Sequence, residues 1–182
     1  MTAAQGAGEL GPIAGYLPHQ PPMRLLDDIV EVTDDRAVCR ATIRPDCVFA
    51  VDGRVHPAAM IEYVAQACAV YAGVVSARDG GGARLGLIMA CREVDFLADG
   101  FAVGDELTIA AHKVFGGGQM AVFTGTVRRG DQVCVTIQLS VIDAEYAAAL
   151  PPGSPGSPGS PGSPGSPGSP GSPGSPGSED DA

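Results

Sequence analysis

Glu62 and Gln66 are the first side chains in this sequence that could perform chemistry. They lie four positions apart in a run that is otherwise almost entirely apolar. In a helix, that spacing places both side chains on one face. Burial disfavours the charged form of a carboxyl group, and a neighbouring amide can orient it. We therefore interpret Glu62 as a candidate general acid. The alternative is a structural carboxylate that caps a helix or pairs within a dimer interface.

Histidine is the other residue type suited to proton transfer near neutral pH, and the chain contains three. His19 lies in a loop with three prolines, which restrict the backbone and favour a fixed position for the imidazole. A histidine in such a loop can equally be structural. His56 directly precedes Pro57 at the predicted helix start. It can be a surface residue that caps the helix, or it can belong to a site near the helix start. His112 falls within a predicted strand, and we assign it no role.

The element that carries Glu62 is a predicted helix from Pro57 to Ala77. Proline suits the first helical turn, and the Ala, Met, Glu and Gln that follow favour helix. The helix is apolar almost all round and close to membrane-spanning length, which is typical of a buried helix or a membrane span. A carboxylate and an amide within it make the membrane interpretation unfavourable. We therefore expect a helix covered by a sheet.

The remaining elements are predicted strands. Two precede the helix and four follow it, and the loops between them contain glycine and aspartate. An antiparallel sheet that curls around one apolar helix would cover it fully, so the expected fold is α+β with the hot-dog architecture. The predicted strands are 23–32, 36–43, 85–97, 105–115, 119–128 and 132–143.

Composition divides the chain into three parts: a flexible leader at 1–13, a hot-dog domain at 14–148 and a disordered tail at 149–182. The tail is a Pro-Gly-Ser repeat with an acidic end, and such repeats bury no apolar area. Before residue 151 the chain has 18 acidic and 11 basic residues. This acidic balance argues against nucleic acid and against a polybasic membrane anchor as partners.

Five cysteines are spread widely along the chain. Their odd number and spacing argue against a disulfide framework and against a zinc site. Reduced, buried thiols in a cytoplasmic protein are the expected state. No segment carries the phosphate-loop pattern or a Gly-x-Ser-x-Gly elbow, which makes a serine hydrolase an unfavourable interpretation.

Two segments together resemble a known family. Leu17-Pro18-His19-x-x-Pro-Met-x-Leu-Leu-Asp27, followed by Ile61-Glu62-Tyr63-Val64-Ala65-Gln66, is similar to the hot-dog 3-hydroxyacyl-[acyl-carrier-protein] dehydratases. The similarity covers roughly residues 14–145 and is closest to the branch associated with aryl polyene biosynthesis. Glu62 matches the acid on the family's helix, and Gln66 matches the glutamine that follows it.

The resemblance implies a dimer and a substrate carried as a thioester on the phosphopantetheine of an acyl carrier protein. A histidine would remove a C2 proton, and the helix carboxyl would protonate the departing C3 hydroxyl to leave a trans-2-enoyl thioester. No metal or other cofactor is implied. Backbone N–H groups of Ala58 and Ala59, at the helix start, are expected to hold the thioester carbonyl. Substrate binding by Gln66 and His56 is also expected.

One departure from the family concerns the base. The fatty-acid dehydratases carry their catalytic histidine in a Gly-His-Phe-Pro motif, and Val48 occupies that position here. His19 is the expected replacement, with His56 as the alternative. Two other functions stay open: a non-catalytic partner in a heterodimer with an active dehydratase, and an acyl thioesterase in which Glu62 activates water. Homodimer and heterodimer also stay open.

Overall fold

The computed structural model describes residues 5–6, 8–82, 85–117 and 119–150. The predicted tail from residue 151 onward therefore lies outside the described residues. In chain order the elements are β1 (Gln5–Gly6), η1 (Ile13–Gly15), β2 (Asp28–Val32), β3 (Arg36–Thr42), β4 (Ala50–Val51), β5 (Arg54–Val55), η2 (Pro57–Ala59), α1 (Met60–Arg78), β6 (Gly86–Phe96), β7 (Phe101–Ala102), β8 (Glu106–Gly117), β9 (Met120–Arg129), β10 (Gln132–Asp143) and α2 (Ala144–Ala149).

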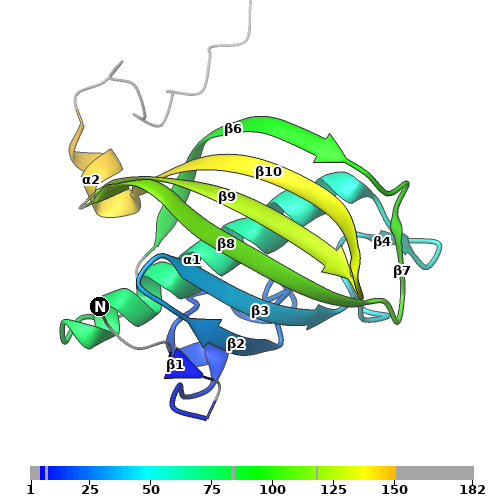
Figure 1. Cartoon of the computed structure of the whole chain (residues 1–182), viewed down its shortest axis with the longest axis horizontal. Coiled ribbons are helices and arrows are strands. Elements are labelled where there is room, and N and C mark those ends of the chain that lie inside the picture. Colours follow the sequence, from blue (N-terminus) through cyan, green and yellow to red (C-terminus); the bar gives the residue numbers. More distant parts are fainter. Residues whose placement is uncertain (1–4, 7, 83–84, 118, 151–182) are drawn as a thin grey trace, which may run out of the picture.

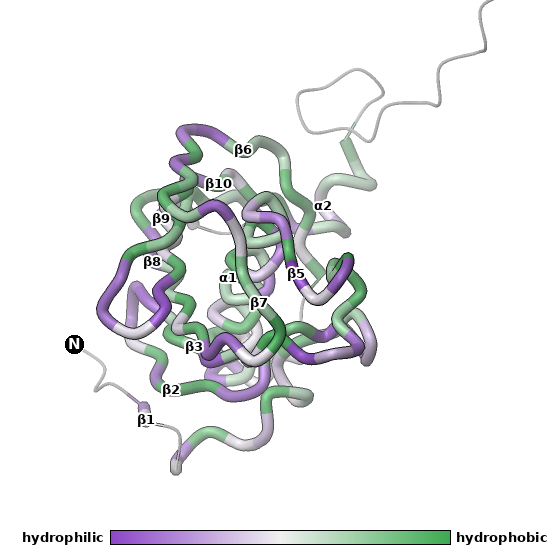
Figure 2. The backbone as a smooth tube through the Cα atoms, turned by 90° about the vertical axis from the view of Figure 1, so that its right-hand side faces the viewer, coloured by the Kyte–Doolittle hydropathy of each residue, from purple (hydrophilic) through white to green (hydrophobic). Residues whose placement is uncertain are grey.

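One antiparallel sheet wraps around α1 (Figure 1). Its strand order is β1-β2-β3-β8-β9-β10-β6, so the three strands of this sheet that precede the helix join the later strands through the β3–β8 pair. Strand β6, which directly follows the helix, is the far edge of the sheet. A separate small sheet of β4, β5 and β7 lies at one end. Seen from the side, α1 runs through the middle of the curved strands (Figure 2).

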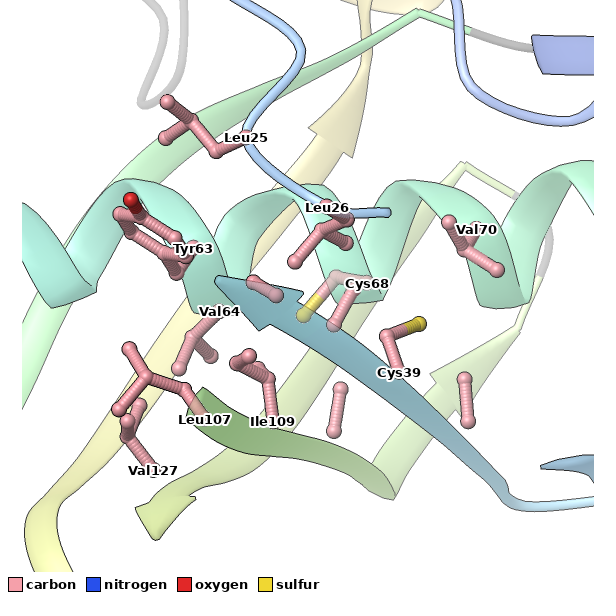
Figure 3. Close-up of a cluster of buried hydrophobic side chains, with 14 of the residues drawn as sticks. Leu25, Leu26, Cys39, Tyr63, Val64, Cys68, Val70, Leu107, Ile109 and Val127 are labelled. Atoms are coloured by element: carbon pink, nitrogen blue, oxygen red, sulfur yellow. The ribbon is translucent and has the colours of Figure 1, made fainter. Parts of the chain in front are cut away.

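The helix is the centre of the core. Its buried side chains include Tyr63, Val64 and Val70. They belong to one hydrophobic cluster with Leu107 and Ile109 of β8 and Val127 of β9 (Figure 3). Gly125 of β9 allows this close approach, because a Cβ there would lie 2.2 Å from Val64 Cγ1. Residues Pro57–Arg78 are long and apolar enough to span a membrane, but here they form the core helix of the hot dog. The predicted α+β hot-dog class is confirmed.

The first long strand is shorter than predicted. We expected a strand from residue 23, whereas β2 begins at Asp28. The preceding residues form a loop in which Leu25 and Leu26 are both buried, although their side chains would point to opposite faces in a strand. The backbone groups of this loop bond to the side chain of Gln66 instead of to a neighbouring strand. The buried amide therefore takes the place of a strand partner.

Part of the predicted leader packs on the domain. Gln5–Gly6 pairs with β2, and Arg78 at the end of α1 donates a hydrogen bond to the Gln5 side chain. Leu10 and Ile13 are buried in the core. The folded part therefore begins earlier than residue 14, because these apolar side chains belong to the buried core.

Asp105 fixes the turn between β7 and β8. Its Oδ2 accepts hydrogen bonds from the Ala102 N–H at 3.0 Å and from Arg129 Nη1 at 2.8 Å. Burial opposes ionisation of this carboxyl group, but the two bonds outweigh it and hold the pKa of Asp105 below its usual value.

Candidate active site

Glu62 and His19 lie close together in the structure. Nε2 of His19 is 3.6 Å from Oε1 of Glu62, although the two residues are 43 positions apart in the chain. Their side chains are 29% and 28% exposed, and both line one cavity. Glu62 is less buried than expected, because it lies in the first turn of α1, where the helix faces this cavity. The two predicted proton-transfer residues are thus brought together at a place that a substrate can reach.

Gln66 connects this pair to the backbone. Its Nε2 donates to Glu62 Oε1 at 2.9 Å and to the Met23 carbonyl at 2.7 Å, and its Oε1 accepts from the Leu25 N–H at 2.9 Å. The side chain is 0% exposed and does not line the cavity. The predicted substrate-binding role therefore needs correction. Both amide protons and the oxygen are already engaged, so Gln66 orients Glu62 and holds the loop that carries His19.

Close packing on the helix fixes the start of the His19 loop. A Cβ on Gly73 would lie 2.2 Å from the Tyr16 carbonyl oxygen, so only glycine allows this segment to lie directly on α1. Leu17 is fully buried beside it. The other end of the loop is held by Arg44, which pairs with Asp27 at 2.7 Å and donates to the Arg24 carbonyl at 2.8 Å. His19 therefore projects from a segment that is anchored at both ends.

The two ring nitrogens of His19 have different surroundings. Nε2 faces Glu62, whereas Nδ1 is buried and has no hydrogen-bond partner among the described residues. A buried N–H without an acceptor costs about 1–3 kcal/mol. Nδ1 therefore lacks an acceptor for a ring proton among the described residues, whereas a proton on Nε2 would point toward the Glu62 carboxyl group.

The cavity has a volume of about 500 Å³ and extends along α1 away from the Glu62 end. On the helix side, its wall consists of small residues at successive turns. The opposite wall is apolar and comes from three strands. The residues that form these walls are Ala65, Ala69 and Ala72 on α1, and Ile88, Phe123 and Val141 on β6, β9 and β10. The shape is a long apolar groove with an acid–base pair near one end.

His56, Ala58 and Ala59 are placed differently from the prediction. His56 caps the η2 turn: its Nδ1 accepts a hydrogen bond from the Ala58 N–H at 3.1 Å, and its carbonyl accepts one from the Ala59 N–H at 3.0 Å. None of the three residues lines the cavity. His56 therefore engages both N–H groups that were expected to hold the thioester carbonyl. It forms a surface helix cap, which was the alternative interpretation of this residue.

The position at which the fatty-acid dehydratases carry their catalytic histidine lies outside the groove. Val48 is 44% exposed in the loop before β4, and it does not line the cavity. The next residue toward the N-terminus, Cys47, has its Sγ 3.7 Å from the Tyr63 hydroxyl. Burial raises the pKa of the Tyr63 phenol well above its usual value, so this hydroxyl stays neutral. Among the described residues, His19 is the only histidine that lines the cavity.

Lys113 lines the cavity, and the sequence analysis missed it. It continues the inward row of β8 after Leu107, Ile109 and Ala111, which are all buried. Its ammonium nitrogen lies 5.9 Å from the centre of the Tyr71 ring on α1. The sequence did contain a signal for this position. Alternate residues of the strand point to the same face, and the apolar series at 107, 109 and 111 is followed by the only lysine of the chain.

A sheet that wraps around one long helix defines the hot-dog fold, and solved structures support this assignment. A chain of the dehydratase heterocomplex ApeI:P from Xenorhabdus doucetiae matches with a TM-score of 0.70 and 27% identity, over 74% of this chain and 91% of that chain. The fold alone is shared with the E. coli PaaI protein from the phenylacetic acid degradation operon (TM-score 0.50, 20% identity, 64% and 78% covered). The same holds for a hypothetical thioesterase with coenzyme A from Streptococcus pneumoniae (TM-score 0.51, 13% identity, 64% and 87% covered).

Residues 11–151 match the ApeP-like family, described as ApeP dehydratase, and the chain therefore belongs to this family of dehydratases. The resemblance to hot-dog dehydratases of the aryl-polyene type is thereby confirmed. No curated protein matches the chain.

Proposed function

We propose that this protein dehydrates 3-hydroxyacyl thioesters carried on an acyl carrier protein and releases trans-2-enoyl thioesters. The observation that carries the proposal is the 3.6 Å approach of His19 Nε2 to Glu62 Oε1 in the wall of an apolar groove. Dehydration needs one group to remove the C2 proton and another to protonate the C3 hydroxyl, and both must reach neighbouring carbon atoms of one substrate. The proposed elimination uses side-chain proton transfer only, without metal or redox cofactor, and we place it in the cytoplasm.

In this proposal, His19 is the base and Glu62 is the acid. Nε2 of His19 would accept the C2 proton, and the Glu62 carboxyl would give its proton to the departing hydroxyl as water forms. A free lone pair on Nε2 requires the ring proton to reside on Nδ1. Since Nδ1 lacks an acceptor among the described residues, a water molecule or a carbonyl of a second subunit is part of the proposed active state.

We further propose that the second subunit is another hot-dog chain that binds along β6. This strand is the edge of the sheet, and Leu87, Ile88 and Phe96 on it are exposed, as is Leu97 just beyond it. An exposed apolar edge strand is a template for pairing with another strand. The match to a chain of a dehydratase heterocomplex supports a partner of this kind, whether identical or different.

The test is a dehydration assay with 3-hydroxybutyryl thioester on an acyl carrier protein, using the full chain alone and together with a second hot-dog dehydratase. His19→Asn and Glu62→Gln preserve shape and remove proton transfer, so each should lower kcat by about 10²–10⁴-fold. The matched controls are His112→Asn and Glu106→Gln, which change exposed residues outside the groove and should leave kcat unchanged. Rates for both site variants within a factor of two of the parent would exclude the assigned roles.

A second candidate function is a non-catalytic partner subunit. Val48, at the position where the fatty-acid dehydratases carry their catalytic histidine, favours it. In that case the chain alone would be inactive, and His19→Asn would leave the activity of the mixed complex unchanged. Release of free thiol from both hydroxyacyl and saturated thioesters would indicate a thioesterase instead.

A further inference from the structure

Asp27 ends the loop that carries His19, and the proposed reaction gives this carboxylate no role. Both of its oxygens are engaged: Oδ1 accepts a hydrogen bond from Arg44 Nη1 at 2.7 Å, and Oδ2 accepts one from the Thr42 N–H at 2.7 Å. The Asp27 N–H also donates to the Arg40 carbonyl at 2.9 Å. The end of the loop is therefore attached to the last residues of β3 through both its side chain and its backbone.

Arg44 extends this attachment back along the loop toward His19. While Nη1 holds Asp27, Nη2 donates to the Arg24 carbonyl at 2.8 Å, so one planar guanidinium bridges two points of the loop. The Arg24 N–H in turn donates to the Gln20 carbonyl at 3.0 Å, and Gln20 directly follows His19. A continuous path of hydrogen bonds thus leads from the Asp27 carboxylate to the residue next to His19.

The backbone around Arg24 is held from a second side by the helix. Gln66 bonds to the Met23 carbonyl and to the Leu25 N–H, which belong to the two neighbours of Arg24. The same amide donates to Glu62. This stretch of the loop is therefore tied to the acid by the amide and to β3 by the guanidinium.

The His19 imidazole depends on this backbone for its position. Its Nδ1 has no hydrogen-bond partner among the described residues, and its Nε2 approaches Glu62 Oε1 only to 3.6 Å. That distance is longer than a hydrogen bond. Since no short polar contact of the ring to a described residue fixes it, the loop must place the imidazole.

We propose that Arg44, held by Asp27, is a positioning residue that sets the reach of the His19 imidazole toward Glu62. This inference rests on the proposed function, because it takes His19 and Glu62 as the base and the acid. Proton transfer requires hydrogen-bond reach, and a misplacement of about 1 Å can lower a rate about 100-fold. Arg44→Met releases the Arg24 carbonyl and should lower kcat by about that factor. KM should change little, because Arg44 does not line the groove.

A second ion pair of the same kind provides the matched control. Arg129 Nη1 lies 2.8 Å from Asp105 Oδ2, and this carboxylate also accepts a backbone N–H, that of Ala102. The Arg44 and Arg129 side chains are 35% and 37% exposed, so the loss of either pair should affect stability to a similar extent. Arg129 lies outside the groove and bonds to no residue of the His19 loop among the described residues. Arg129→Met should therefore lower Tm as Arg44→Met does but retain the parental kcat.

The first experiment measures Tm, kcat and KM for the full chain, in whichever assembly converts 3-hydroxybutyryl thioester on an acyl carrier protein. Arg44→Lys is included in case Arg44→Met does not fold. Lysine keeps the charge near Asp27 but lacks the rigid fork that bridges two acceptors, so this variant should also lower kcat, by about 10-fold or more. Equal kcat values for the Arg44 and Arg129 variants at equal Tm would show that Arg44 acts on stability alone and would overturn the inference.

The second experiment follows the imidazole itself and needs no turnover. In magnetic resonance spectra of the chain labelled with ¹⁵N-histidine, Glu62→Gln should shift the His19 ring signals, because the two groups lie 3.6 Å apart. The same substitution should shift them clearly less in the Arg44→Met or Arg44→Lys background and fully in Arg129→Met. An undiminished response in the Arg44 variants would refute the positioning role. If no thioester is converted, the proposed function fails separately, and this comparison still decides whether Arg44 positions His19.

Discussion

Replacing Gln66 by leucine should lower both the stability of the protein and its activity. Leucine fills a similar volume but makes none of the three hydrogen bonds of the amide. The Leu25 N–H and the Met23 carbonyl would be left without partners beside a fully buried side chain. At about 1–3 kcal/mol for each orphaned group, the free energy of unfolding should fall by roughly 2–6 kcal/mol. Because the same loop carries His19, kcat should fall as well.

The measurement combines thermal unfolding with the dehydration assay. For a domain of this size, the expected loss of stability corresponds to a Tm decrease of roughly 5–20 °C. Gln132→Leu is the matched control, because Gln132 is exposed at the start of β10, and the Tm of this variant should stay within about 2 °C of the parent. A Gln66→Leu variant that melts like the parent and retains full activity would refute the assignment of Gln66 as the residue that orients Glu62.

Three further results are expected. Gly73→Ala should lower kcat by displacing the segment that carries His19, since the added Cβ would lie 2.2 Å from a backbone oxygen of that segment; unchanged kinetics would contradict this. Gly125→Ala should destabilise by about 1–3 kcal/mol through overpacking, and a second substitution, Val64→Ala, should recover part of the loss in a double-mutant cycle. Because the pKa of Asp105 is held low, its contribution to stability should be present at neutral pH and decrease as the pH falls below about 4. Asp105→Asn should therefore lower the denaturant midpoint of unfolding at pH 7. The midpoint of this variant should also change less than that of the parent as the pH falls below about 4.

Local sequence patterns were sufficient for the architecture. The apolar run after Pro57 indicated a buried helix, and period-two patterns with glycine and aspartate turns indicated the strands after it, because these signals arise within each segment. Residues 23–27 were misassigned as strand for the same reason. Their apolar side chains suit a strand, but the partner that satisfies their backbone is Gln66, some 40 residues away, and no local pattern reports it.

The candidate site shows the same division. Residue type and local context are enough to identify Glu62 and His19 as proton-transfer groups. Three features depend instead on the tertiary structure, in which the sheet curls around α1. They are the short distance between His19 and Glu62, the engagement of the Ala58 and Ala59 N–H groups by His56, and the position of Lys113 in the groove. Sequence by itself determined which chemistry the chain carries, because chemistry resides in side chains. Only the tertiary structure decided which of these groups share a cavity, because contacts between distant segments are set by packing of the whole domain.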